Sequence, residues 1–229
     1  IVGGMERVFE FSKDFRNEGM DRSHNPEFTM LECYAAYWDY TDMMGFVEEL
    51  FGTLAREIAG GPEIRYGEHT INLAPPWRRL AYYEGLREAT GRDLREADAA
   101  ALKKIAEERG LEIEGASSRG DFLDLLFGGL VEPGLIQPTF VMDYPIEISP
   151  LAKRHRSESG LVERFEPYVA GYEVGNAFSE LSDPADQRER FEAIAKLGAG
   201  GARETHPVDE DYIRALEYGM PPTGGLGVG

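Results

Sequence analysis

The sequence predicts a mixed α+β fold in which one antiparallel β-sheet is flanked by helices. Residues 8–15 and 28–37 alternate apolar and polar side chains, as half-buried strands do. Strand character returns at residues 137–144, 162–170 and 172–181, after a long stretch with helical periodicity. Strands at both ends with helices between them predict a single domain over residues 1–229, with a helical insertion at about residues 75–130.

The first two strands carry the most informative side chains. Phe9, Phe11 and Phe15 alternate with polar residues in the first strand, so we expect a half-buried strand with its phenylalanine face toward the core. Arg16 then lies on the opposite, polar face. In the second strand the same alternation places on one side Phe28, Met30, Glu32 and Tyr34.

Apolar spacing and capping signals define the helices. Residues 42–58 carry an apolar stripe at intervals of three and four, formed by Met43, Val47, Leu50, Leu54 and Ile58. We expect a hairpin over residues 63–73, with its turn at Tyr66-Gly67. Further helices are expected over residues 78–90, 95–109, 121–130 and 209–218. Another begins at Asp183-Pro184, because aspartate caps a helix and proline needs no amide hydrogen bond in the first turn.

Composition narrows the class of protein. The balance of 24 Lys and Arg against 42 Asp and Glu gives a formal net charge of -18, which argues against broad, non-specific binding of nucleic acid. A local basic patch can still hold a tRNA. No segment approaches the roughly 20 apolar residues of a membrane span, and the start lacks the basic and apolar regions of a secretory signal. We therefore expect a soluble protein of the cytoplasm that does not bind a membrane.

Two other leads fail on inspection of the sequence. Ile1-Val2-Gly3-Gly4 matches the mature start of trypsin-like proteases, but Gly120-Asp121 is followed by Phe122 and not by a serine. The single cysteine, Cys33, excludes an internal disulfide and a paired-cysteine metal site, and we expect it to be a small buried residue. The four histidines show no metal-ligand spacing, and only His24, between the first two strands, is a candidate for function.

Arg16, Phe28 and Glu32 form the first group with recognisable chemistry. The arginine offers a planar, permanently charged fork for a phosphate. The phenylalanine offers a flat surface for a base, and the glutamate a carboxylate for a positive group. The combination suits a polyphosphate nucleotide with a cationic group beside it.

A second group lies in the segment RFEPYVAGYEVGNAFSEL. Strand alternation places Asn176, Phe178 and Glu180 on one face. A buried acid is costly unless a cation satisfies it, and a lysine ligand does so with its methylenes along Phe178 and its ammonium at Glu180. Glu166 and Glu173 lie on the two arms of the same hairpin, where paired carboxylates can hold Mg²⁺. For any one of these glutamates, a solvated strand edge is the alternative interpretation.

Five stretches give the chain a family resemblance: FRNEG at 15–19, HNPEFTMLE at 24–32, EISPLAK at 147–153, GNAFSEL at 175–181 and LEYGMPPTGGLGVG at 216–229. In order and spacing, across almost the whole chain, they resemble the class II lysyl-tRNA synthetases. Motif 2 of that class lies at the start and the opening of motif 3 at the end. TMLECY and GNAFSEL resemble the lysine enzymes more than their aspartyl and asparaginyl relatives. The resemblance implies the antiparallel catalytic sheet of the class II synthetases.

The resemblance also implies a role for each matching residue. Arg16 is the catalytic residue, because it grips the α-phosphate of ATP and the lysine carboxylate. The residues implied to bind ATP are Arg16, Asn17, Glu18, His24, Asn25 and Phe28. The residues implied to bind lysine are Glu32, Tyr34, Asn176, Phe178 and Glu180. The Mg²⁺ ligands are Glu166 and Glu173.

The implied reaction joins L-lysine and ATP into lysyl-adenylate and then passes lysine to tRNA(Lys), with no protein nucleophile. Family features expected before Ile1 are motif 1, which forms the dimer interface, the anticodon-binding barrel and a further lysine-contacting acid. The arginine that clamps the far side of ATP is expected just after Gly229. We therefore expect a fragment of a homodimeric parent, with poor lysine activation by this chain alone.

Two alternatives remain open at this stage. One is a synthetase-like paralogue that transfers lysine to a protein or a lipid; the residues upstream of Ile1 distinguish it, since such relatives usually lack the anticodon domain. The other is a non-catalytic module that binds lysine or ATP for regulation. The presence of Arg16, Glu32, Asn176 and Glu180 argues against the second alternative.

Overall fold

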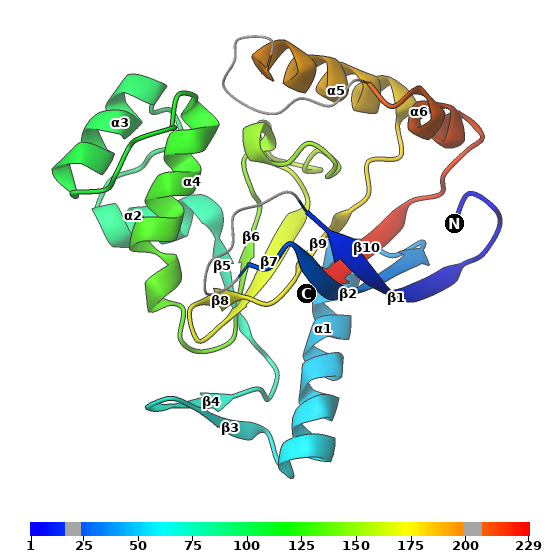
Figure 1. Cartoon of the computed structure of the whole chain (residues 1–229), viewed down its shortest axis with the longest axis horizontal. Coiled ribbons are helices and arrows are strands. Elements are labelled where there is room, and N and C mark those ends of the chain that lie inside the picture. The colour runs from blue at the N-terminus through cyan, green and yellow to red at the C-terminus, as the bar shows by residue number, and fades with distance from the viewer. Residues whose placement is uncertain (17–23, 199–207) are drawn as a thin grey trace.

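The computed structural model describes residues 1–16, 24–198 and 208–229 (Figure 1). The strands are β1 (Arg7–Phe15), β2 (Glu27–Ala36), β3 (Glu63–Tyr66), β4 (His69–Asn72), β5 (Arg78–Ala81), β6 (Thr139–Met142), β7 (Arg164–Val169), β8 (Tyr172–Glu173), β9 (Asn176–Ser179) and β10 (Thr223–Val228). The α-helices are α1 (Tyr40–Leu54), α2 (Tyr82–Thr90), α3 (Ala99–Glu108), α4 (Arg119–Leu130), α5 (Pro184–Gly198) and α6 (Glu210–Glu217). Three short helical turns are η1 (Ala55–Ala59), η2 (Glu132–Gly134) and η3 (Ile146–Ile148).

Within the described ranges, eight strands form one sheet in the order β1-β2-β10-β9-β7-β6-β5, with β8 paired to β7. All pairings are antiparallel except β5 with β6, which is parallel. The predicted α+β fold with an antiparallel sheet is confirmed. The expected helix over 78–90 is wrong in its first turn, because Leu80 is buried and its segment pairs with β6 before the helix begins at Tyr82.

Helix α1 packs against one face of the sheet and forms a core with it. Figure 1 shows α1 below the sheet, and the buried side chains of the helix include Met43, Met44 and Val47. Asp39 caps the helix, since its carboxylate accepts hydrogen bonds from the backbone N–H groups of Thr41 and Asp42. The helix therefore starts two residues before the expected start at residue 42.

The predicted stripe of this helix does not stay buried to its end. Leu54 is 45% exposed and Ile58 is 80% exposed. The α-helix gives way to the wider π-helical turn η1 at Ala55, which rotates the following side chains out of the stripe. The prediction of one continuous amphipathic α-helix over residues 42–58 is therefore wrong beyond Leu54, where the α-helix ends, and Leu54 itself is already partly exposed.

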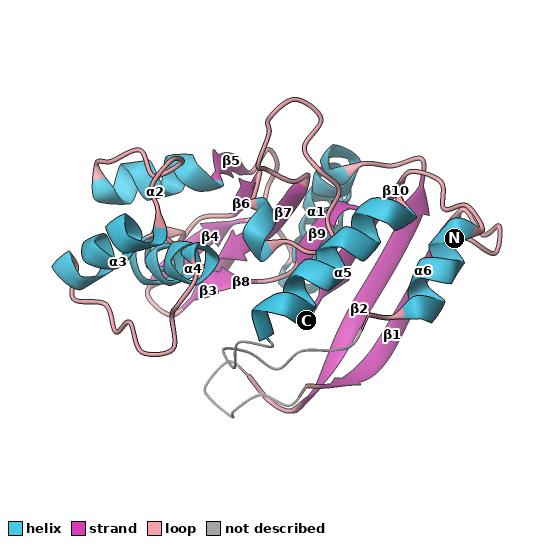
Figure 2. Cartoon of the chain, turned by 90° about the horizontal axis from the view of Figure 1, so that it is seen from above, coloured by secondary structure: helices cyan, strands magenta, loops and turns pink. Residues whose placement is uncertain are grey.

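The opposite face of the sheet is covered in two parts. At the β5-β6-β7 end, helices α2, α3 and α4 pack on it through a second core that includes Leu86, Leu102, Leu123 and Phe127. At the other end, α5 and α6 lie above β9, β10 and β2 (Figure 2). The helix expected over residues 95–109 begins only at Ala99, where Asp98 caps it, and the start of α5 at Pro184 with Asp183 as its cap is confirmed.

The phenylalanines of β1 do not face a core in this structure. Phe9, Phe11 and Phe15 are 73%, 69% and 74% exposed, which contradicts the prediction that their face is buried. These side chains lie on the α1 side of the sheet, but α1 packs on β9 and β10 and leaves the edge strand uncovered. A mostly apolar groove of about 510 Å³ runs beside them, lined by β1, β2 and α1.

Two adjacent glycines of β10 face opposite sides of the sheet. A Cβ atom added to Gly224 would lie 3.0 Å from Cγ of Met43 in α1, whereas one added to Gly225 would point to the other face. The strand therefore separates the α1 core from the opposite face by little more than backbone. The β3-β4 hairpin follows the prediction, with a positive φ of 57° at Gly67 in its turn. None of the helices in the described ranges is long and apolar enough to cross a membrane.

Candidate active site

The strand register gathers most of the predicted ligand-binding residues on the face opposite α1. One row across the sheet consists of Glu32, Gly227 and Asn176. The next row consists of Tyr34, Gly225, Phe178 and Arg164. Since side chains alternate along a strand, both rows project to the same side, and Glu180 follows on that side beyond Phe178. As alternation predicted, Glu32 and Tyr34 share one side of β2, and Asn176 and Phe178 share one side of β9.

Glu180 is a buried acid over the bare backbone of Gly225. It is 8% exposed. A Cβ atom, if Gly225 had one, would lie 1.9 Å from Oε1 of Glu180 and 2.9 Å from Cε1 of Tyr34, so no side chain fits there. Burial, and then the charge of Glu32, raises the pKa of Glu180 to about 8. The hydroxyl of Tyr34 donates to Oε1 of Glu32 at 3.4 Å, and burial followed by Glu180 raises the pKa of Tyr34. No lysine or arginine of the described residues pairs with Glu180, so an ionised carboxylate at this position has no compensating cation.

Arg16 and Phe28 lie together at the far end of β1 and β2. The guanidinium carbon of Arg16 is 5.2 Å from the centroid of the Phe28 ring, a cation–π contact. Arg16 is exposed, and its backbone N–H donates to the carbonyl of Pro26 at 3.0 Å. His24 and Asn25 are exposed in the loop before β2. Asn17 and Glu18, also predicted to bind nucleotide, lie outside the described residues.

Arg164 lies at the centre of the site although no role was predicted for it. Its Nε donates to Oδ1 of Asn176 at 3.1 Å, and its Nη2 donates to Oε1 of Glu166. Its Nη1 donates to the carbonyl of Ile148 at 2.8 Å and to Oγ of Ser149 at 2.9 Å. The guanidinium carbon also lies 4.5 Å from the centroid of the Tyr144 ring. The side chain is only 14% exposed.

Glu166 is held from several directions, whereas Glu173 is open. Oε2 of Glu166 accepts hydrogen bonds from the hydroxyls of Tyr144 at 2.5 Å and Tyr168 at 2.8 Å. The hydroxyl of Tyr168 also lies 3.0 Å from Oε1 of Glu132. Glu173 pairs in register with Tyr168, so it lies on the same face as Glu166. Partial desolvation, and then the charge of Glu166, raises the pKa of Glu173.

The family model described as tRNA synthetases class II (D, K and N) matches residues 1–229, the whole of the sequence. The chain belongs to this family. Among curated relatives of this class II synthetase chain, "Lysine--tRNA ligase" of Nostoc punctiforme is 53% identical over 231 residues. The proteins with that name from Thermosynechococcus vestitus and Roseiflexus are each 52% identical. All of this chain is covered in each match, but it spans only 41%, 46% and 47% of those relatives' lengths.

Two carboxylates of this class II synthetase chain fit a Mg²⁺ ion. Glu166 and Glu173 supply hard carboxylate oxygens on one face, and a cation between them relieves the charge that raises the pKa of Glu173. Within the described ranges no three acidic, histidine or cysteine side chains are grouped to hold a metal by themselves. The two carboxylates therefore fit a metal that takes its other ligands from phosphates and water, which is the habit of Mg²⁺.

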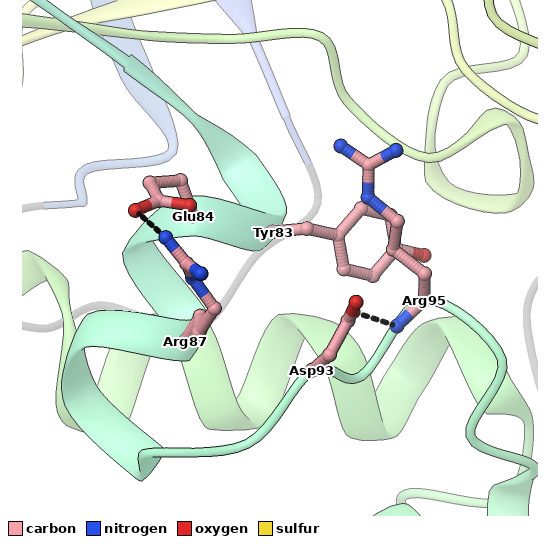
Figure 3. A pocket seen from close by; sticks show the side chains of 5 residues that line it. All are labelled: Tyr83, Glu84, Arg87, Asp93 and Arg95. Atoms are coloured by element: carbon pink, nitrogen blue, oxygen red, sulfur yellow. Dashed lines mark hydrogen bonds and ion pairs between the residues drawn. The ribbon is translucent and has the colours of Figure 1, made fainter.

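One further cavity lies away from this site, beside helix α2. Figure 3 shows this hollow of about 200 Å³, lined by Tyr83, Glu84, Arg87, Asp93 and Arg95. Arg87 donates to Glu84 at 2.5 Å, and Arg95 pairs with Glu158 at 3.0 Å. The arginines of this cavity are thus already matched by carboxylates, and the cavity contains none of the predicted site residues.

The synthetase site contains residues that sequence reasoning missed. Arg164 and Gly225 belong to it by direct contact, and Tyr144 and Tyr168 support Glu166. Tyr212 of α6 lies close enough to the acid corner that burial, and then the charge of Glu180, raises its pKa. In the structure Arg164 opens a strand whose next four positions are buried. The other contacts depend on pairing between distant segments, which the sequence does not display.

Proposed function

We propose that this chain is the catalytic part of a lysine–tRNA ligase, which activates L-lysine with ATP and transfers it to tRNA(Lys). The observation that carries the proposal is Glu180, a buried carboxylate next to Glu32 with no basic partner among the described residues. A carboxylate buried in this way is costly to ionise until a cation binds. The names of the curated relatives support the same substrate and acceptor.

Lysine fits the site in one orientation. Its side-chain ammonium lies at Glu180, its methylenes run along Phe178, and its α-amino group lies toward Glu32 and Tyr34. Asn176, one row further along the sheet, meets the α-carboxylate. An uncharged side chain of the same length leaves Glu180 buried without a partner, so the site rejects it much more strongly than an apolar pocket does.

The first step is an in-line displacement at the α-phosphate of ATP. A carboxylate oxygen of lysine forms a bond to the α-phosphorus as the bond to the pyrophosphate oxygen breaks, giving lysyl-adenylate and pyrophosphate. Arg16 binds the α-phosphate and the lysine carboxylate together, so it holds the reacting groups in contact and stabilises the charge that develops. Phe28 supports adenine, and His24 and Asn25 approach the nucleotide. Asn17 and Glu18, which lie outside the described residues, are also proposed to bind it. Mg²⁺ held by Glu166 and Glu173 supplies charge neutralisation at the phosphates when bound.

The second step transfers lysine to the tRNA. A hydroxyl of the terminal ribose attacks the carbonyl carbon of lysyl-adenylate, its proton is released, and AMP leaves with the bonding electron pair. No side chain of the protein becomes covalently attached at either step. The full-length protein is proposed to act as a homodimer in the cytoplasm.

The proposal is tested with Glu180→Gln in the full-length protein. The change keeps the size of the side chain and removes its charge, so we expect kcat/KM for lysine in ATP–pyrophosphate exchange to fall by about 10²–10³-fold. Preference over norleucine, which lacks the ammonium, is expected to be lost. Glu63→Gln, in an exposed glutamate of β3, is the control and leaves both quantities unchanged. If the Gln variant keeps the preference for lysine, the pocket is wrongly assigned. If the unaltered protein shows no lysine-dependent exchange, the ligase activity itself is wrong.

A further inference from the structure

Arg164 joins the two halves of the proposed site. It opens β7 opposite Phe178 of β9, on the face that carries the lysine-binding residues. One nitrogen of its guanidinium bonds to Asn176, assigned to the lysine carboxylate, and another bonds to Glu166, assigned to the metal. No other contact in the described residues links an assigned lysine ligand to an assigned metal ligand through one side chain.

The contact with Asn176 fixes which way the amide faces. An arginine only donates hydrogen bonds, so the atom of Asn176 that lies 3.1 Å from its Nε must be the amide oxygen. The amide NH₂ group then points away from Arg164 and is available as a donor. A donor is what a carboxylate requires, whereas the reversed amide presents an oxygen and repels it.

The contact with Glu166 fixes a carboxylate in the same way. Arg164 binds Oε1, and the hydroxyls of Tyr144 and Tyr168 bind Oε2. Each carboxylate oxygen has about two lone-pair sites, so Oε1 keeps capacity for one further ligand. The arginine and the two hydroxyls therefore hold the carboxylate in one orientation without filling it.

Arg164 is itself held rigidly enough to do this. Its Nη1 binds the carbonyl of Ile148 and the hydroxyl of Ser149, and its guanidinium stacks 4.5 Å above the ring of Tyr144. Its four bond acceptors lie around a planar fork. A lysine at this position has a single ammonium and cannot reach Asn176 and Glu166 in the same geometry.

We propose that Arg164 is a positioning residue that turns the Asn176 amide toward the lysine carboxylate and orients Glu166 toward the metal. One side chain thus aligns the group that binds lysine and the group that binds the metal. The proposal rests on the proposed function. Arg164 acts through its neighbours and does not touch the reacting atoms. Its removal should therefore weaken lysine binding through Asn176 and metal binding through Glu166.

The test is a pair of double-mutant cycles in the full-length protein. Arg164→Lys is expected to weaken lysine binding, measured by calorimetry without ATP or metal, by roughly tenfold. In an Asn176→Ala background the same change is expected to alter lysine affinity by less than about twofold, because the group it acts through is gone. For the second arm, Mn²⁺ is titrated by electron paramagnetic resonance with α,β-methylene-ATP present. Arg164→Lys is expected to weaken Mn²⁺ binding, and to do so much less in a Glu166→Gln background.

Arg190→Lys is the matched control. Arg190 is also a buried arginine, 7% exposed, and it donates to the carbonyls of Ser149 and Ala152, so it supports the same loop without reaching the site. It is expected to lower thermal stability and leave lysine affinity unchanged. If Arg190→Lys weakens lysine binding as much as Arg164→Lys, the role of Arg164 is only structural and the proposal is overturned.

The remaining outcomes are also decisive. If the unaltered protein does not bind lysine, the proposed function fails before Arg164 is tested. If it binds lysine but the losses of Arg164→Lys and Asn176→Ala simply multiply, the positioning role is wrong. Should Arg164→Lys not fold, Asn176→Asp replaces it, because aspartate still accepts the bond from Arg164 but presents an oxygen where the NH₂ group stood. That variant is expected to lose at least roughly tenfold in lysine affinity, and an unchanged affinity overturns the proposal.

Discussion

Lysine binding is expected to depend on pH through Glu180. The pKa of this buried carboxyl is raised to about 8, so the empty pocket holds a proton at neutral pH. The fraction ionised is about one hundredth at pH 6, about one tenth at pH 7 and about one half at pH 8. Because lysine binds the ionised form, its apparent affinity rises about tenfold between pH 6 and 7 and about fivefold between pH 7 and 8. Near pH 6 to 7, each lysine that binds releases close to one proton from Glu180.

The assay is calorimetry of lysine binding to the full-length protein, in buffers that differ in ionisation enthalpy. The dependence of the heat on the buffer counts the protons released. Glu180→Gln carries no titrating group here, so its weaker binding is expected to vary far less with pH. Glu173, whose pKa is also raised, is present in both proteins, and their difference therefore isolates Glu180. Equal pH dependence in the two proteins refutes the reasoning.

The same pKa has a consequence for stability whose sign can be stated. The folded carboxyl of Glu180 keeps its proton up to about pH 8, whereas the unfolded one releases it near the ordinary value of 4.5. Between these values the folded state binds more protons, so the free energy of unfolding falls as the pH rises. One pKa unit corresponds to about 1.4 kcal/mol, and the decline across this window is of the order of a few kcal/mol. Urea denaturation of the Gln variant should lack this decline.

Two further changes test the packing around the site. Gly225→Ala is expected to displace Glu180 and weaken lysine binding by roughly tenfold or more, whereas Gly224→Ala, directed at α1, lowers the melting temperature and spares lysine affinity. Calorimetry and thermal unfolding separate the two, and equal effects on affinity contradict the packing described. Arg156→Met leaves the buried Glu163 without its ion pair and costs about 1–3 kcal/mol in urea denaturation at pH 7. Burial alone raises the pKa of Glu163. Hydrogen bonds from Arg156 and then from the hydroxyl of Ser179 nevertheless hold that pKa below its usual value. The deficit therefore shrinks as the pH falls below the ordinary value of 4.5 towards the lowered pKa of the folded carboxyl, and a constant deficit contradicts the ion pair as its cause.

Alternation along single strands was enough to predict which side chains share a face of the sheet. Glu32 and Tyr34 in β2, and Asn176 and Glu180 at β9, lie on one face because the period of a strand is two. The distance between the two strands was not available from the sequence. It depends on β10 inserting between them with a register set by backbone hydrogen bonds, and β10 comes from the other end of the chain.

Burial was harder to predict than orientation. Alternation gives the side of the sheet on which Phe9 and Phe11 lie, but whether that side is dry depends on what covers it. Leu80 shows the reverse case, since local periodicity favoured a helix and pairing with β6 produced a strand. Arg164 was overlooked because an isolated arginine in a sequence is usually a surface residue, and only its neighbours from three separate segments show that it is enclosed.

The glycine pair of β10 leaves a partition only one backbone thick between the α1 core and the proposed lysine pocket. Met43 packs against β10 at Gly224 on the α1 face of the sheet, and Glu180 packs against β10 at Gly225 on the opposite face. A substitution at Met43 that creates a cavity or displaces β10 should therefore change the proposed lysine end of the pocket directly, because only the backbone of β10 lies between them. Attempts to change the amino acid accepted by this scaffold should consequently vary Met43 together with Glu180, although Met43 never meets the substrate.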